Sequence, residues 1–286
     1  MSDYRDYRER RVTATDGLSL FVRDHGDPLA SRTPVLCLSG VARTSRDFDD
    51  LAPRLAADRR VICPDYRGRG QSSYDTDWRN YHPRIYIRDI LDILTALDVH
   101  RVVVIGTSLG GLLAMALAVA RPVALAGVVL NDVGPEINLS GVSRIVDYMR
   151  ANARQPDWDS AVRFIKQNYR HDGLTGDDQW RRLAGRTYAE GHDGVLRYDF
   201  DPAIVHGLER GSDTLPSHWP VFRALARIPV LALRGAFSDV LTEAVFERMS
   251  REKSDLIHVT IPGVGHVPLL DEPESERAID DFLQRH

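Results

Sequence analysis

The segment Val102-Val103-Val104-Ile105-Gly106-Thr107-Ser108-Leu109-Gly110-Gly111-Leu112-Leu113 joins a β-branched run to an Ala- and Leu-rich helical pattern. This pattern predicts a strand, a sharp turn and a helix, with Ser108 at the tip of the turn. Because Gly106 and Gly110 carry no Cβ, the strand and the helix can approach closely and hold the serine in a strained backbone conformation. The positive end of the helix favours negative charge beside the hydroxyl. We therefore predict that Ser108 is a nucleophile rather than part of an ordinary glycine-rich turn.

Short apolar runs alternate with amphipathic stretches at both ends of the chain. The predicted strands are 18–23, 35–38, 60–63, 102–105, 125–130, 230–233 and 256–261. The predicted helices are 48–57, 85–97, 109–120, 242–250 and 274–284. Strands that alternate with helices imply a mostly parallel sheet covered by helices on both faces. The predicted fold class is therefore α/β.

About a hundred residues separate Leu130 from Val230, whereas loops in α/β units usually take about two to six residues. The intervening chain carries helical patterns at 142–153, 158–169 and 178–188. We predict a core in two parts, 1–133 and 225–286, with an inserted helical cap at 134–224. The cap is expected at the carboxyl ends of the strands, where open α/β sheets bind ligands. Its many aromatic residues predict an apolar pocket.

A serine hydroxyl needs a base to take its proton, and His266 has the most informative context among ten histidines. It lies in Pro262-Gly263-Val264-Gly265-His266-Val267-Pro268, between the last predicted strand and the last predicted helix. A loop histidine is usually just a solvated side chain. The glycine and proline frame, however, predicts a rigid loop that aims the imidazole over the edge of the sheet, so we predict that His266 is the general base.

The base requires a carboxylate that fixes its tautomer and stabilises the imidazolium. Asp239 follows the predicted strand 230–233 and is the acid that we expect. It could instead be an ordinary aspartate at a helix N-terminus, where the helix dipole favours it. Asp132, at the end of the predicted strand 125–130, is the alternative acid.

Together these motifs resemble the α/β-hydrolase family, specifically its capped serine hydrolases. Residues 106–110 resemble the nucleophile elbow, and the order Ser108, Asp239, His266 is the family's order of nucleophile, acid and base. Residues 64–72 are similar to its Asp-x-Arg-Gly-x-Gly-x-Ser loop, and residues 266–273 to its usual ending. The resemblance covers almost the whole chain from about Arg11. It implies an α/β-hydrolase fold, a mostly parallel central sheet flanked by helices with an inserted helical cap.

The resemblance also implies an oxyanion hole made of the main-chain N–H groups of Leu109 and Val41. The loop that contributes the second group usually contains His-Gly in this family, but here it reads Leu38-Ser39-Gly40-Val41-Ala42-Arg43. Serine replaces histidine, so the hydrogen bonds of this loop differ from the family pattern. Gly40 and Arg43 are candidate substrate-binding residues. Arg43 would bind a substrate carboxylate, or else it is a solvated surface arginine.

The implied reaction is acyl transfer to water by a Ser-His-Asp triad. We expect a hydrolase that cleaves a carboxylic ester of a small or medium apolar substrate. A lactonase or a C–C bond hydrolase with the same triad is the alternative, although the later glycines of the C–C hydrolase loop are missing. A small-molecule receptor on the same fold is the alternative from another class. No metal-ligand cluster, P-loop or dinucleotide motif is found, so we expect neither a metal nor a cofactor.

The composition is that of an ordinary globular protein, with 43% hydrophobic and 27% charged residues and a net charge of -4. This charge predicts neither a nucleic-acid nor a membrane partner, and it allows a homodimer as well as a monomer. Residues 1–11 are polar and contain no apolar run of signal-peptide length, so we expect a cytoplasmic protein. Cys37 and Cys63 lie in apolar runs and are expected to be buried free thiols.

Overall fold

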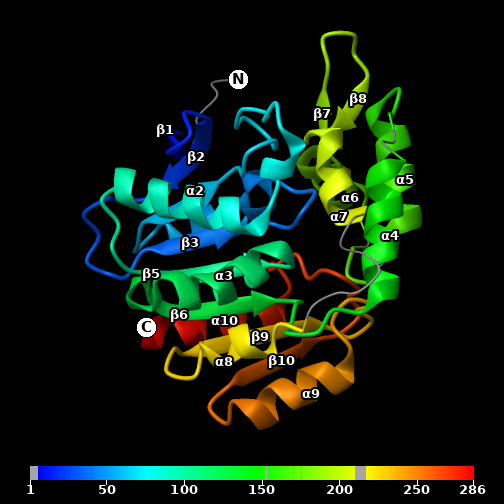
Figure 1. The fold of residues 1–286 in the computed structure, drawn as a ribbon. Coiled ribbons are helices and arrows are strands. Elements are labelled where there is room, and N and C mark those ends of the chain that lie inside the picture. Colours follow the sequence, from blue (N-terminus) through cyan, green and yellow to red (C-terminus); the bar gives the residue numbers. More distant parts are fainter. Residues whose placement is uncertain (1–5, 152–153, 170, 175, 210–216) are drawn as a thin grey trace.

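An eight-stranded sheet forms the centre of the computed structural model, which describes residues 6–151, 154–169, 171–174, 176–209 and 217–286 (Figure 1). In chain order its strands are β1 (Tyr7–Thr13), β2 (Ser19–His25), β3 (Val35–Leu38), β4 (Val61–Pro64), β5 (Val102–Thr107), β6 (Leu125–Asn131), β9 (Val230–Gly235) and β10 (Ile257–Ile261). Their spatial order is β1-β2-β4-β3-β5-β6-β9-β10. In this spatial order, the six strands β4, β3, β5, β6, β9 and β10 pair in parallel with one another. Strand β2 is antiparallel to both of its neighbours, β1 and β4.

Helices cover both faces of the sheet, as expected for parallel strands that are buried on both sides. The flanking helices are α1 (Leu51–Leu55), α2 (Pro83–Ala96), α3 (Leu109–Ala120), α8 (Trp219–Arg223), α9 (Glu243–Glu252) and α10 (Pro273–Arg285). Residues of α2, α3, α8 and α9 belong to one apolar cluster, and residues of α1 and α10 belong to the other. Strand β5 is entirely buried between them. The predicted α/β fold with a mostly parallel sheet is confirmed.

The inserted segment, residues 134–224, contributes no described residue to the eight-stranded sheet. Its elements are α4 (Leu139–Arg150), α5 (Trp158–Asn168), α6 (Asp177–Thr187), β7 (Tyr188–Glu190), β8 (Leu196–Tyr198) and α7 (Val205–Glu209), followed by α8. Figure 1 shows α4 to α7 and the β7–β8 hairpin gathered beside one end of the sheet. Helix α8, in contrast, contacts α3 and so lies against the core.

Some elements differ from the predictions for local reasons. The predicted helix 48–57 is broken into a 3-10 turn, Ser45–Phe48, and the short helix α1. Strand β1 was not predicted because it is an edge strand with mostly charged residues, which hide the apolar alternation. The β7–β8 hairpin is too short to show a period of two. Part of the predicted helix 142–153 lies outside the described residues.

The described part of the chain contains no helix that is long and apolar enough to cross a membrane. Cys37 and Cys63 are buried free thiols on the neighbouring strands β3 and β4, as predicted. Burial raises the pKa of the Cys63 thiol well above its ordinary value. The two cysteines are therefore part of the packed core.

Candidate active site

Ser108 forms the turn between β5 and α3 with a backbone φ of 50° and ψ of -113°. A positive φ is rare for a non-glycine residue and holds the side chain out of the turn. The glycines on either side allow this conformation. A Cβ on Gly106 would lie 2.5 Å from the backbone of Gly110, and one on Gly110 would lie 2.0 Å from the Leu38 carbonyl oxygen. The local sequence thus sets up the predicted serine turn through close packing of strand, helix and neighbouring strand.

His266 lies beside Ser108, in the loop that connects β10 to α10. Its Nε2 atom is 3.2 Å from the Ser108 Oγ, which is hydrogen-bond distance. The imidazole is largely buried, with 7% of its side chain exposed. The structure thus brings together the serine and the histidine predicted from the sequence.

The carboxylate that contacts His266 belongs to Asp132, which directly follows β6. Its Oδ2 atom is 2.7 Å from Nδ1 of the imidazole. Ser238 Oγ donates to the same oxygen at 2.7 Å, and the Gly235 N–H donates to Oδ1 at 2.8 Å. The Asp132 side chain is completely buried. This set of donors fixes a buried carboxylate against the imidazole.

The prediction that Asp239 supports the imidazole is wrong, and the alternative acid, Asp132, occupies that position. Asp239 instead forms a bidentate ion pair with Arg144 of α4, at 2.6 and 2.8 Å, and 38% of its side chain is exposed. Partial burial acts to raise the pKa of Asp239, but Arg144 outweighs this effect and lowers it. The physical reason is local: Arg144 of α4 holds the Asp239 carboxylate away from the imidazole, whereas the Gly235 N–H and Ser238 Oγ hold Asp132 against it.

The two residues predicted to supply the oxyanion-hole N–H groups, Leu109 and Val41, lie on different elements near Ser108. Leu109 is the first residue of α3, so its N–H has no acceptor within the helix. Val41 lines the same cavity as Ser108. The loop that carries Val41 is held by its substituted serine: Ser39 Oγ donates to the Arg43 carbonyl at 3.3 Å. The departure from the His-Gly pattern therefore leaves the loop with a hydrogen bond of its own.

Arg69 is a residue of the site region that the sequence analysis missed. It is fully buried, and its Nε donates to the Val41 carbonyl oxygen at 2.7 Å. Its guanidinium lies over the rings of Tyr66 and Tyr86, with distances of 5.4 and 4.9 Å to the ring centroids. Tyr66 Oη also donates to the Ser39 carbonyl at 3.2 Å. The only signal in the sequence was an arginine inside the 64–72 loop, which is fully compatible with a solvated side chain.

A cavity opens over Ser108 between the core and the inserted segment. It encloses about 1010 Å³ of space free of protein atoms, part of which is open to solvent. The inserted segment contributes Arg144, Ile145, Tyr148, Ile165, Asn168, Tyr169, Leu183 and Thr187 to its wall. Trp180 and Trp219 are instead buried in the apolar core. The wall is largely apolar, as the sequence predicted, although only some of the aromatic residues reach it.

Arg43 and Asp47 place a charged pair in this cavity. Arg43 Nη2 lies 2.5 Å from Asp47 Oδ1, and its Nη1 donates to Thr187 Oγ1 of α6 at 2.6 Å. Burial acts to lower the pKa of the Arg43 guanidinium, but Asp47 more than offsets this effect and raises it. The guanidinium therefore remains charged inside the cavity. Gly40 lies beside it, because a Cβ there would be 3.2 Å from the Arg43 Cγ.

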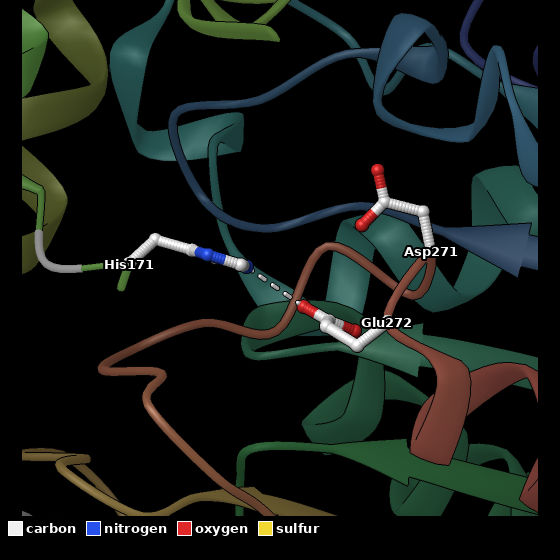
Figure 2. A group of neighbouring side chains, drawn as sticks. All are labelled: His171, Asp271 and Glu272. Carbon is white, nitrogen blue, oxygen red and sulfur yellow. Dashed lines mark hydrogen bonds and ion pairs between the residues drawn. The ribbon is translucent and has the colours of Figure 1, made fainter. Parts of the chain in front are cut away.

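Among the described residues, His171, Asp271 and Glu272 have potential metal-ligating atoms within 4.8 Å of one another. Figure 2 shows a hydrogen bond only between His171 and Glu272, at 3.1 Å, with the Asp271 carboxylate apart from it. The Glu272 oxygens already accept hydrogen bonds from the Leu269 and Leu270 N–H groups and from Ser275 Oγ. Protein donors therefore already engage both oxygens of the Glu272 carboxylate.

The model of the alpha/beta hydrolase family matches residues 35–278 of this chain. The match covers most of the chain, including the turn at Ser108 and the loop of His266. The chain belongs to the alpha/beta hydrolase family.

Individual relatives agree with this placement. The chain is 35% identical over 260 residues to a 3-hydroxybutyrate-oligomer hydrolase of Cupriavidus necator, covering 87% of each chain. It is 27% identical over 270 residues to a 2-(acetamidomethylene)succinate hydrolase of Mesorhizobium japonicum, covering 93% of this chain and 92% of that one. A solved α/β hydrolase from Novosphingobium aromaticivorans is 42% identical with a TM-score of 0.92, covering 98% of this chain and 99% of that one.

Proposed function

We propose that this protein hydrolyses carboxylic esters through an acyl-enzyme on Ser108. The observation that carries the proposal is the continuous contact from Ser108 Oγ through His266 to the buried Asp132, with distances of 3.2 and 2.7 Å. A nucleophile, a base and an orienting acid in hydrogen-bond contact are the parts that acyl transfer requires. Asp132 takes the role for which the sequence favoured Asp239.

In the first half-reaction, His266 Nε2 accepts the Ser108 proton while Oγ attacks the ester carbonyl carbon. Negative charge develops on the carbonyl oxygen, where the N–H groups of Leu109 and Val41 donate to it. Asp132 stabilises the imidazolium without taking its proton. The intermediate then collapses, the C–O bond breaks, and the imidazolium gives its proton to the leaving alkoxide.

In the second half-reaction, a water molecule takes the place of the departed alcohol. His266 accepts a proton from this water as its oxygen attacks the acyl carbon of the ester on Ser108. The same N–H pair holds the second oxyanion, and collapse returns the proton to Ser108 Oγ with release of the acid. Each proton passes through one nitrogen, Nε2, so no other side chain has to act as a general acid or base in the cycle.

The cavity wall supports a short substrate that carries one polar group. Most of the wall is apolar, but Arg43 and Arg144 contribute cations to it, and Arg43 lies beside Gly40. One relative is named as a hydrolase of 3-hydroxybutyrate oligomers. An oligomer of that hydroxy acid contains ester bonds and a terminal carboxylate. We propose that the substrate is a small or medium ester, and that Arg43 binds a carboxylate or another polar group on it.

The experiment is hydrolysis of p-nitrophenyl esters graded in length from acetyl to octanoyl. Ser108→Ala should reduce turnover by at least about a thousandfold while the circular dichroism spectrum stays unchanged. Ser254→Ala is the matched control, because Ser254 lies exposed between α9 and β10, and it should keep full activity. Retained activity in Ser108→Ala would refute the proposal. If wild-type protein turns over none of these esters, lactones and C–C substrates are the next to be tested.

A further inference from the structure

Tyr169, His171 and Asp172 of the inserted segment lie against the loop that carries His266. The Asp172 N–H donates to the Gly263 carbonyl at 2.8 Å, and His171 forms an isolated antiparallel β-bridge with Val264. This places main-chain contacts from the inserted segment within three residues of the imidazole-bearing residue, on its N-terminal side.

Tyr169 holds the same loop on the other side of His266. Its Oη donates a hydrogen bond to the carbonyl of Val267, the residue that directly follows His266. Burial, with help from Glu272, raises the pKa of the Tyr169 hydroxyl, so the hydroxyl stays protonated and can donate. Tyr169 also lines the cavity over Ser108. One side chain of the inserted segment thus contacts both the cavity and the backbone beside His266.

The third connection is the buried pair of His171 and Glu272, whose side chains are 4% and 7% exposed. In Figure 2 the two residues come from the inserted segment and from the start of α10, and they meet end to end. Glu272 Oε1 also accepts the Leu269 N–H at 2.7 Å, and its Oε2 accepts the Leu270 N–H at 3.1 Å. Through these bonds His171 is linked to the C-terminal part of the His266 loop.

We propose that His171 is a positioning residue that aligns His266 with Ser108. This inference rests on the proposed function, in which His266 is the base. The loop from 262 to 272 spans the gap between β10 and α10, and contacts from the inserted segment hold it before, beside and after His266. The core holds the same loop through Asn131 Nδ2, which donates to the Pro268 carbonyl at 2.9 Å, and through the Asp132 carboxylate, which contacts the imidazole itself. Docking of the inserted segment adds a second set of contacts, and together the two sets fix the direction in which the imidazole points.

Among these contacts, the hydrogen bond between His171 and Glu272 joins two buried side chains, and we therefore assign the positioning role to it. The Nε2–H of His171 donates to the Glu272 carboxylate whether the imidazole is neutral or charged, so the contact is kept in either form. A misplacement of a catalytic group by about 1 Å can cost on the order of a hundredfold in rate. Loss of the contact should therefore reduce kcat, whereas the apolar wall that binds the substrate stays in place.

The test uses two substitutions at His171 and one matched control. His171→Phe keeps a planar aromatic ring, somewhat larger than imidazole, but removes the donor. His171→Gln restores an N–H that reaches Glu272. Asp199→Ala is the control, because it breaks the ion pair between Asp199 and Arg46, at 2.7 Å, which also links the inserted segment to the core. If the phenylalanine variant does not fold, His171→Ala replaces it, since water can then reach Glu272.

Turnover is measured with the best p-nitrophenyl ester, and the His266 ring protons are followed by NMR without substrate. His171→Phe should lower kcat by about ten- to a hundredfold with KM changed by less than about twofold. It should also shift or broaden the downfield signal of the proton between His266 and Asp132. His171→Gln should restore most of kcat and the signal, and Asp199→Ala should match wild type in both.

An unchanged downfield signal in folded His171→Phe overturns the inference, whatever the turnover shows. The inference also fails if kcat falls no further in His171→Phe than in Asp199→Ala. It fails as well if the loss of kcat in His171→Phe is fully explained by a smaller folded fraction, measured by circular dichroism. The NMR readout separates the two proposals. If wild-type protein hydrolyses no ester but the signal still depends on His171, the proposed function fails and the positioning role stands.

Discussion

His266 Nδ1 and Asp132 Oδ2 lie 2.7 Å apart although the two residues are 134 positions apart in the chain. The loop after β10 and the end of β6 meet because both strands end at the same edge of a parallel sheet. Asp132 also accepts hydrogen bonds from Gly235 and Ser238 at the end of β9. The carboxylate is thus held by the strand and loop next to it, independently of the histidine.

Asp132→Asn should lower kcat by about a thousand- to ten-thousandfold, because an amide no longer holds the imidazole in the required tautomer. Asp239→Asn should change kcat by less than about tenfold, since that residue pairs with Arg144 and not with His266. Both variants are compared with wild type on the same p-nitrophenyl ester. If Asp239→Asn lowered kcat more than Asp132→Asn, Asp239 and not Asp132 would be the acid that supports His266.

Gly110→Ala should destabilise the fold. The new Cβ would lie 2.0 Å from the Leu38 carbonyl oxygen and 2.6 Å from the Leu38 carbonyl carbon, which are backbone atoms of a buried strand. We expect a loss of about 3 kcal/mol or more in unfolding free energy, seen as a fall in Tm of roughly 6 °C or more by calorimetry. Gly185→Ala is the control, because a Cβ there meets nothing within 4 Å. Equal Tm values for the two variants would contradict the close packing at the turn.

Arg43→Gln should lower kcat/KM for substrates with a free carboxylate more than for uncharged substrates. The change removes the cation and leaves Asp47, which repels an anion in the cavity. The ratio of kcat/KM for p-nitrophenyl hemisuccinate to that for p-nitrophenyl butyrate should fall at least about tenfold. The two esters differ mainly in the carboxylate, so each serves as the control for the other. An unchanged ratio would mean that Arg43 only closes the wall through Asp47 and Thr187.

Glu272→Gln should change the response of stability to acid. Burial acts to raise the pKa of Glu272, but hydrogen bonds from His171, Ser275 and the Leu269 N–H outweigh it, and the net pKa lies below the ordinary value of 4.5. The carboxylate therefore stabilises the fold above about pH 4.5, and this contribution is lost as the pH falls through the lowered pKa.

At neutral pH the unfolding free energy of Glu272→Gln should be about 1–3 kcal/mol below that of wild type. The difference should shrink as the solution is acidified below pH 4.5, because only the wild-type side chain takes up a proton there. Urea denaturation from neutral to acid pH measures both quantities. A difference that stays constant with pH would assign the effect to packing and not to charge.

Much of the core could be predicted from the sequence because its signals are local. The change from a β-branched run to a helical period around Ser108 specifies a strand, a turn and a helix without reference to the rest of the chain. The loop of His266 is similar, since Pro262 restricts its own backbone and the nearby glycines mark a turn. These features depend on residues that are neighbours in the chain.

The acid could not be assigned in this way, because the choice between Asp132 and Asp239 depends on contacts between residues that are far apart in the chain. Both residues follow apolar runs and look alike in sequence. Strand β6 lies between β5 and β9, and Arg144 of α4 neutralises Asp239. The contact of His171 with Glu272 was also beyond the sequence, since it depends on how the inserted segment packs.

The backbone of Ser108 is held in a conformation that costs a serine about 1–3 kcal/mol and costs a glycine very little. Selection for heat resistance alone should therefore favour glycine at position 108, whereas selection for hydrolysis keeps the serine. If one library of variants is selected separately for heat resistance and for hydrolysis, the two selections should enrich different residues at position 108. The enriched residue then shows whether the selection required catalysis or only a folded protein.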